Sequence, residues 1–262
     1  MKKFLSIILI AILLFSCVAC SGSSGDGEVD IITNSNNVYE DTNNGDRFTY
    51  EVNDKGGYDI VGFSSKNSKP HKVVIPASIL GVEVSGIADR AFIANTAISE
   101  VEIPDGVVSV GTDAFYGCVY LTSVKMADSV TEIGTGAFGS CPVLKSVELS
   151  AAIKVIPEFA FRGCTAITNI SLPASLEKIE RGAFFACTSL AEIAVPAGVT
   201  EIGDCAFYGN LALVKATVPA SVETFGQVVF NGTAQSFVLI GEEGSAAQTY
   251  AQDNEYAFEA AE

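Results

Sequence analysis

The pentapeptide AFYGC, residues 114–118, recurs along the chain with small variations. Related copies begin at residues 91 (AFIAN), 137 (AFGSC), 160 (AFRGC), 183 (AFFAC) and 206 (AFYGN). Their phenylalanines and one further phenylalanine keep a constant step of 23 residues: Phe92, Phe115, Phe138, Phe161, Phe184, Phe207 and Phe230. A fixed step of this length indicates a repeat protein, in which each copy forms one structural unit.

The other apolar positions keep the same step, so the unit reads approximately L-x-x-V-x-L-P-x-x-V-x-x-I-G-x-x-A-F-x-G-C-x-x. One unit cannot bury its apolar side chains alone, and copies must therefore stack into a solenoid. The alternation at Val124 and Met126 predicts a short strand, which proline ends in several copies. SVTEIG, residues 129–134, predicts a second short strand, and the AF segment predicts a turn or a single helical turn.

The two ends of the array depart from the repeat, as solenoid ends must if they are to cover an open apolar face. Residues 47–75 predict an N-terminal β cap, because aromatic and β-branched residues flank a turn at Asp54–Gly57. Residues 76–242 are expected to form the repeats, and the five extra residues of the first repeat are expected to belong to the cap. Residues 243–262 predict a C-terminal cap, with a helix begun by Ser245 and a strand near 256–258.

The N-terminus has the pattern of an export signal. Lys2 and Lys3 precede an apolar run at residues 4–15, which is too short to span a membrane comfortably. The cysteines that follow resemble those of bacterial lipoprotein signals, in which a cysteine becomes the lipid-modified N-terminus. We expect a signal peptide at residues 1–19 and a lipid on Cys20, with Cys17 as the alternative; a plain secretory signal is the other interpretation.

Residues 20–46, rich in Ser, Gly, Asn and Asp, predict a flexible tether between the lipid and the folded part. The composition then limits the partners. The 262 residues carry a formal net charge of -16, which disfavours nucleic acid. We therefore expect a membrane contact through the lipid alone and no nucleic-acid partner.

The sequence offers little for catalysis. The only histidine, His71, lies in SKPHKVVIP, far in sequence from clustered acids and serines, and is interpreted as a solvated cap residue. No phosphate loop, zinc motif or nucleophile elbow is present in the sequence. We expect no enzymatic activity, no catalytic residue, no cofactor and no metal site.

One polar column runs through the repeats at the end of the AF segment: Asn95, Cys118, Cys141, Cys164, Cys187 and Asn210. A single column means a single structural position, stacked at about 4.8 Å. Stacked cysteines lie near enough for disulfides, yet their side chains run parallel and asparagine occupies the same column. We interpret the column as a structural ladder of free thiols. Cys205 lies outside it, in a variable column, and is expected to be more exposed.

With the strand, proline, isoleucine-glycine and AFxxC elements in one unit, the chain resembles the BspA-like bacterial leucine-rich repeat proteins over about residues 70–242. The small polar residue precedes the strand, whereas the eukaryotic leucine-rich pattern places it after the strand. The resemblance implies a leucine-rich repeat solenoid, a β-rich right-handed superhelix. It also implies a surface protein associated with adhesion to host extracellular proteins or to other bacteria.

The outward positions of the first strand are the candidate binding residues: Glu100, Glu102, Ser123, Lys125, Ser146, Glu148, Asn169, Ser171, Glu192 and Lys215. They are polar and mixed in charge, which suits a protein or glycan partner but is also usual in any soluble solenoid. We expect a monomeric, exported, surface-exposed lipoprotein that binds such a partner. The alternative is an envelope lipoprotein that captures nutrients or acts as a scaffold, binding glycans or peptides.

Overall fold

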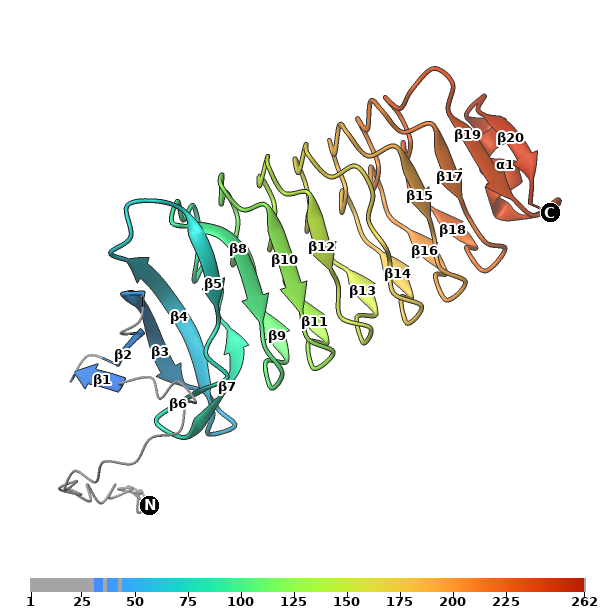
Figure 1. The fold of residues 1–262 in the computed structure, drawn as a ribbon. Coiled ribbons are helices and arrows are strands. Elements are labelled where there is room, and N and C mark those ends of the chain that lie inside the picture. Colours follow the sequence, from blue (N-terminus) through green and yellow to red (C-terminus); the bar gives the residue numbers. More distant parts are fainter. Residues whose placement is uncertain (1–30, 35–36, 42–43, 262) are drawn as a thin grey trace, which may run out of the picture.

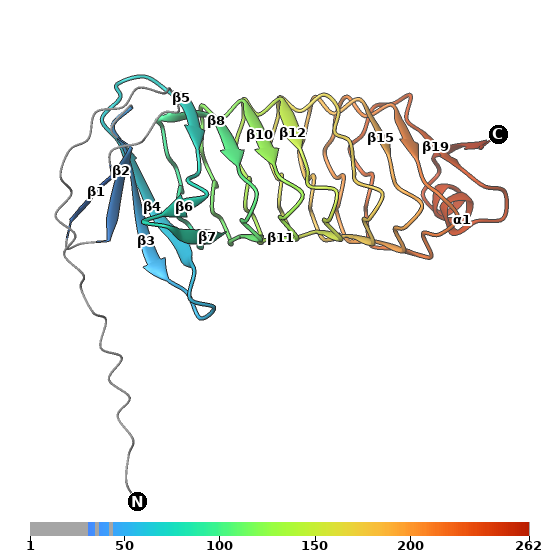
Figure 2. The ribbon, with the colours of Figure 1, turned by 60° about the horizontal axis from the view of Figure 1, so that its bottom comes forward.

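The protein is an elongated stack of rungs, closed by antiparallel strands at one end and by a helix and a strand at the other (Figures 1 and 2). The computed structural model describes residues 31–34, 37–41 and 44–261. Each regular rung contributes a strand to a first-strand face, a shorter strand to a second-strand face, and the AF segment to a turn face. The solenoid expected from the repeat is confirmed.

The elements are grouped by face. The N-terminal strands are β1 (Ile31–Asn34), β2 (Val38–Asp41), β3 (Asp46–Val52) and β4 (Tyr58–Ser65). The first-strand face holds β5 (His71–Val74), β8 (Ile98–Ile103), β10 (Ser123–Met126), β12 (Ser146–Glu148), β15 (Glu192–Ala194), β17 (Lys215–Thr217), β19 (Val238–Gly241) and β20 (Ala257–Ala260). The second-strand face holds β7 (Val82–Ile87), β9 (Ser109–Val110), β11 (Glu132–Ile133), β13 (Val155–Ile156), β14 (Lys178–Ile179), β16 (Glu201–Ile202) and β18 (Thr224–Phe225). β6 (Ser78–Ile79) and α1 (Ala246–Asp253) complete the set.

The rung follows from the period of its apolar residues. In β10, Val124 and Met126 point inward and are buried, whereas Lys125 between them is exposed. β10 pairs in parallel with β8 and β12, and Val124 lies opposite Val101 and Val147, each one repeat away. Since the register equals the repeat length, identical positions stack directly over one another.

The turn face is held by main-chain bonds between rungs and by a stack of aromatic rings. Phe115 N donates to Ala137 O of the next rung at 2.7 Å, and Phe161 N donates to Ala183 O at 2.8 Å. The rings of Phe92, Phe115, Phe138, Phe161, Phe184, Phe207 and Phe230 stack with centroids 4.7–5.6 Å apart. All seven phenylalanines are buried. The column that indicated the repeat is therefore the centre of its core.

The N-terminal end differs in its boundaries from the sequence prediction. β3 and β4 form the expected hairpin, but β1 and β2 add two antiparallel strands inside the range 20–46 that was assigned to the tether. β5, inside the predicted cap, already pairs in parallel with β8. The five extra residues of the first repeat form the β6–β7 hairpin. Phe48 and Phe63 of the hairpin contact Phe92, which covers that end of the ring stack.

At the C-terminal end, Ser245 begins α1, and its side chain accepts a hydrogen bond from Gln248 N. The helix buries Ala247 and Ala251 against the last rung. The ring of Tyr250 stacks on Phe225, with centroids 4.6 Å apart. β20 pairs with β19, one residue later than the strand predicted near 256–258.

The glycines of the isoleucine-glycine position serve close packing. The sequence suggested a left-handed turn at Gly111, Gly134, Gly203 and Gly226, although Pro157 and Glu180 in the same column argued against an obligatory positive φ. Among the described residues, none of these four glycines has a positive φ. A Cβ on Gly134 would instead lie 2.4 Å from Thr112 N of the preceding rung. Glycine at these four positions therefore lets neighbouring rungs approach closely.

Both strand faces are interrupted near the middle of the array. On the first-strand face the ladder ends at β12 and resumes at β15, although the repeat predicted a strand at residues 167–172. On the second-strand face it stops between β11 and β13. Pro157 contributes to the second interruption, since it has no N–H to donate where Gly134 and Gly203 donate to the preceding rung. No residue in 167–172 explains the first interruption.

Candidate functional site

The candidate binding residues form two columns on the first-strand face. Register pairs Ser123 with Glu100 and Ser146, and Lys125 with Glu102 and Glu148. Farther along, β15 and β17 place Glu192 opposite Lys215. These residues are exposed or half-buried, on a face that Figure 1 shows running along the stack. The structure thus assembles eight of the ten candidates on regular strands; Asn169 and Ser171 lie in the interruption.

The charged part of the face lies toward the N-terminal end. Lys72 Nζ lies 2.6 Å from a Glu102 carboxylate oxygen. This hydrogen bond with Lys72 lowers the pKa of Glu102, and the same contact raises the pKa of Lys72. Lys125 lies across from Glu102 and Glu148, yet it has no ion pair with a carboxylate of the described residues. The charge of Lys125 nevertheless helps to lower the pKa of Glu102, and the Glu148 carboxylate also forms no ion pair with a described residue.

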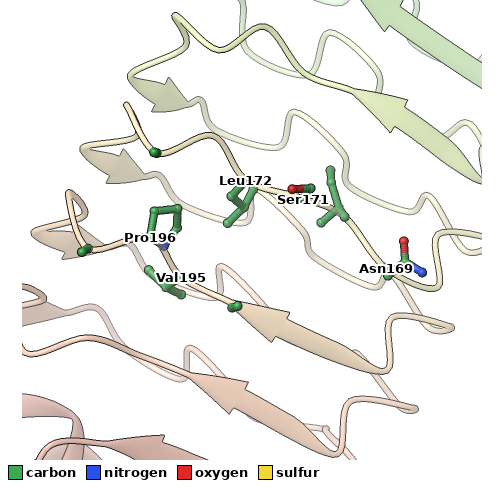
Figure 3. A pocket seen from close by; sticks show the side chains of 9 residues that line it. Asn169, Ser171, Leu172, Val195 and Pro196 are labelled. Carbon is green, nitrogen blue, oxygen red and sulfur yellow. The ribbon is translucent and has the colours of Figure 1, made fainter.

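The middle of the face is an open depression of about 550 Å³. Figure 3 shows side chains from its two successive rungs, with Asn169, Ser171 and Leu172 on one and Val195 and Pro196 on the next. The remaining lining residues are Ile170, Ala174, Ala194 and Ala197. The sequence singled out Asn169 and Ser171 but missed the others. Small residues in adjacent repeats, Ala174 beside Ala197, are the one sequence feature that could have indicated a hollow.

The polar column on the turn face is a ladder of hydrogen bonds. The thiols of Cys118, Cys141, Cys164 and Cys187 are free and buried. Each donates to the carbonyl of the phenylalanine 26 residues earlier, at 3.1–3.3 Å. Asn210 uses its Oδ1 to accept from Cys187 N at 2.8 Å, and Asn95 accepts from Ala97 N. All six residues therefore act within the fold.

Burial lowers the acidity of two of these thiols. It raises the pKa of Cys118 and of Cys187 to about 12. The pKa of Cys141 is also raised, and the largest cause is a hydrogen bond with the Cys164 side chain. A thiol that stays protonated is a poor nucleophile and a poor metal ligand. Cys205, which is half-buried, lies on the left-handed turn position with φ 54°.

His71 was interpreted as a solvated cap residue, and the structure corrects this. Its Nε2 lies 2.9 Å from both carboxylate oxygens of Asp46, which is almost fully buried at 1% exposure. The pair ties β3 to the start of β5. In the described part of the chain, no group of three or more His, Cys, Asp and Glu side chains could hold a metal ion.

The exposed aromatic residues of the turn face mostly contact neighbouring repeats. Phe185 and Tyr208 stack with centroids 5.2 Å apart, and the Arg162 guanidinium lies 5.6 Å from the Phe185 ring. The Tyr116 ring lies over Gly139. Because the Phe185 ring already contacts Tyr208 and Arg162, this aromatic cluster offers less free surface to a partner than the first-strand face does.

The lipid-anchor prediction at Cys20, or alternatively Cys17, and the signal peptide at 1–19 lie outside the described residues. Within the residues that the structure describes, no helix is long and apolar enough to cross a membrane.

Comparisons with known proteins agree with this architecture. The family model of the BspA type leucine rich repeat region matches residues 85–210 and 154–254, in six copies. The leucine-rich repeat protein of T. pallidum is 26% identical over 81% of this chain and 95% of its own, with a TM-score of 0.57. A leucine rich cell surface protein of Faecalibacterium prausnitzii A2-165 has a similar fold, at 20% identity over 82% of this chain and 77% of its own, with a TM-score of 0.50.

A search among curated proteins gives no match. The family model alone covers more than half of the chain, and its repeat is the one seen in the stacked rungs. The chain therefore belongs to the family of BspA-type leucine-rich repeat proteins.

Proposed function

We propose that the protein is displayed on a bacterial surface and binds another macromolecule, chiefly protein, through its first-strand face, without catalysing a reaction. The observation that carries the proposal is the register of Glu102, Lys125 and Glu148. These three charged side chains lie on adjacent strands of the first-strand face, one strand spacing apart. Lys125 and Glu148 have no ion-pair partner among the described residues. Charges arranged in this way select a complementary partner and speed its association.

Display at the surface is supported by three separate points. The chain belongs to the BspA type of leucine-rich repeat proteins, and one similar solved structure is described as a cell surface protein. The N-terminal sequence has the export pattern described above. We propose lipid attachment at Cys20 or Cys17, which mass spectrometry of the mature N-terminus tests; an unmodified terminus would contradict it.

The adhesion hypothesis is tested by capture from extracts of host extracellular matrix and of bacterial surfaces. We expect the native chain to retain a protein that an unrelated acidic protein does not. The variant Glu102→Lys/Lys125→Glu/Glu148→Lys should bind it about tenfold more weakly or worse, a loss of about 1.4 kcal/mol.

The matched control is Glu132→Lys, which makes the same change of +2 in net charge on the second-strand face. It should leave the affinity within about twofold, the spread expected of a charge remote from the interface. Equal weakening by both variants would show that overall charge, and not this face, determines binding. Retention of glycans in place of proteins would favour the nutrient-capture alternative.

A further inference from the structure

One arginine of the turn face has no acidic partner. The other arginines of the chain, Arg47, Arg90 and Arg181, each have a guanidinium nitrogen 2.8–3.7 Å from a carboxylate oxygen. Arg162 is exposed, and its guanidinium has neither an ion pair nor a hydrogen bond with any residue that the structure describes. A guanidinium carries five N–H donors in a planar fork that matches a carboxylate. The side chain of Arg162 therefore has its donors available to an anion.

Two aromatic rings hold this guanidinium in place. Its central carbon lies 5.6 Å from the ring centroid of Phe159, in the same rung, and 5.6 Å from that of Phe185, in the next rung. Such cation–π contacts stabilise the cation without neutralising it. The Phe159 ring fits because a glycine lies beside it, since a Cβ on Gly182 would clash with the ring. The guanidinium is thus positioned before a ligand arrives, which reduces the entropy lost on binding.

The charge around Arg162 is positive, although the whole chain carries a formal net charge of -16. Three successive rungs contribute stretches that contain Lys145, Arg162 and Arg181 but no Asp or Glu: residues 133–147, 159–176 and 181–191. Lys145 is exposed and, like Arg162, has no ion pair within the described ranges. This part of the surface attracts a single anionic group, whereas the net charge of the chain repels a polyanion.

The rings favour a polypeptide over a carboxylated sugar. A sugar needs a free ring face on which to stack. The Phe159 ring already has a second guanidinium over it, that of Arg181 at 4.9 Å, and the Phe185 ring stacks on Tyr208. The surface that these contacts leave is the apolar part of half-buried Phe185 and of exposed Tyr208. Such surface suits the apolar neighbours of a carboxylate in a peptide.

We propose that the turn face at Arg162 binds a carboxylate of a polypeptide, carried by an Asp or Glu residue with apolar neighbours. The guanidinium donates two parallel hydrogen bonds to the two carboxylate oxygens, and the apolar neighbours rest on Phe185 and Tyr208. This site lies on a different face from the charged columns of the first-strand face. It therefore goes beyond the proposed function and does not depend on it.

The test follows the arginine Nε–H signals of the native chain by NMR. Each signal is assigned with a single Arg→Lys variant. The probe is the blocked peptide Ac-Val-Glu-Val-NH2, and Ac-Val-Gln-Val-NH2 is its uncharged control. The glutamate peptide should shift the Arg162 signal saturably, and the glutamine peptide should bind about tenfold more weakly or worse, because it lacks the charge. Equal shifts of all the arginine signals, or no saturable shift, would overturn the proposal.

Variants locate the bound peptide, with binding measured on the peptide's own signals. Arg162→Gln should weaken the glutamate peptide about tenfold or more, whereas the matched control Arg90→Gln should change its affinity less than about twofold. Phe159→Gly removes one ring at φ 57°, which glycine tolerates, and should weaken binding about threefold. Thermal unfolding checks that each variant is folded. Equal losses in the two arginine variants, or unchanged affinity in Phe159→Gly, would contradict the site.

The source of the carboxylate and the face are tested separately. Sodium glucuronate, a carboxylated sugar, should bind more weakly than the glutamate peptide, and equal or tighter binding would overturn the choice of a polypeptide. The variant Glu102→Lys/Lys125→Glu/Glu148→Lys should leave the affinity for the glutamate peptide within about twofold. A loss of peptide binding in this variant would place the peptide on the first-strand face and overturn the inference. Because the peptide is tested without a captured partner, failure of the proposed function leaves this result unaffected.

Discussion

Each cysteine of the buried column occupies a position that needs a small side chain able to form a hydrogen bond with the main chain. Cys164 Sγ donates to Phe138 O at 3.1 Å, and Asn210 fills the same position by accepting from Cys187 N. The sequence alone predicted a structural role from the two asparagines, but not which carbonyls are bound. That detail depends on the chain path between rungs, which the repeat length does not determine.

The reactivity of the thiols follows from their burial. We expect iodoacetamide at pH 8 to label Cys205 within minutes to hours while Cys118, Cys141, Cys164 and Cys187 stay unmodified, because the four column thiols are buried out of reach of the reagent and Cys205 is only half-buried. Peptide mass spectrometry assigns each site, and in a denatured sample all five of these cysteines should be labelled. Rapid labelling of a column cysteine in the native protein, or a disulfide between two of them, would contradict the ladder.

The phenylalanine stack carries a large share of the core. Phe161 is fully buried between Phe138 and Phe184, with centroids 5.6 and 5.4 Å away. Phe161→Ala should lower the free energy of unfolding by about 3–5 kcal/mol, the usual loss for a buried ring. The matched control Phe185→Ala removes a half-buried ring from the next column and should cost less than half as much. Denaturant unfolding measures both, and similar losses would show that the stack is not the core.

At the scale of the element, the main chain of each rung adopts a positive φ at two positions. One column of positive φ holds Asp113, Gly136, Phe159, Gly182 and Cys205, and another holds Gly117, Ser140, Gly163, Ala186 and Gly209. These positions cannot be recognised in the sequence, because only some of them are occupied by glycine. The short strands, the hairpin at Asp54–Gly57 and the cap at Ser245 were predictable because their local patterns are strong.

Two glycines of the rung should respond differently to a methyl group. Gly163 has φ 72° and its nearest heavy atoms lie 3.9 Å from an added Cβ, so Gly163→Ala costs backbone strain alone, about 1–2 kcal/mol. In Gly134→Ala the Cβ would meet Thr112 N at 2.4 Å, which forces the rungs apart. We expect the loss for Gly134→Ala to exceed that for Gly163→Ala in thermal or denaturant unfolding. The reverse order would contradict the close-packing role.

The interruptions mark the limit of prediction at this scale. Pro157 was visible in the sequence, and its missing N–H accounts for one break on the second-strand face. The segment at 167–172 keeps the apolar pattern of its neighbours, with Ile167, Ile170 and Leu172 in place, so nothing distinguished it. A main-chain hydrogen bond between rungs depends on the distance and angle between an N–H and a C=O group, which the apolar pattern does not specify.

At the scale of the whole molecule, the stack is one continuous core whose stability depends on pH through its thiols. The pKa of Cys118 and of Cys187 is raised to about 12 in the folded state, above the ordinary value of 9.0. Above pH 9 the unfolded chain loses protons that the folded chain keeps, so the free energy of unfolding falls as pH rises. Each thiol contributes a slope of up to about 1.4 kcal/mol per pH unit between pH 9 and 12.

This alkaline loss is checked by urea unfolding from pH 8 to 11. Below pH 9 these thiols should leave the free energy of unfolding unchanged. Above pH 9 the free energy of unfolding of Cys187→Ala should fall less steeply with pH than that of the native chain, by a slope that corresponds to about one proton. A decline of equal slope in the variant would place the titrating groups elsewhere, for example in Tyr250 or Tyr256, whose pKa values burial also raises.

Binding on the first-strand face makes a prediction for the whole molecule. It is tested most directly by hydrogen exchange of the native chain with and without a captured partner. We expect slower exchange in β8, β10 and β12 when the partner is bound, and unchanged exchange in the AF segments of the turn face. Protection confined to the turn face, around Tyr116, Phe185 and Tyr208, would contradict it.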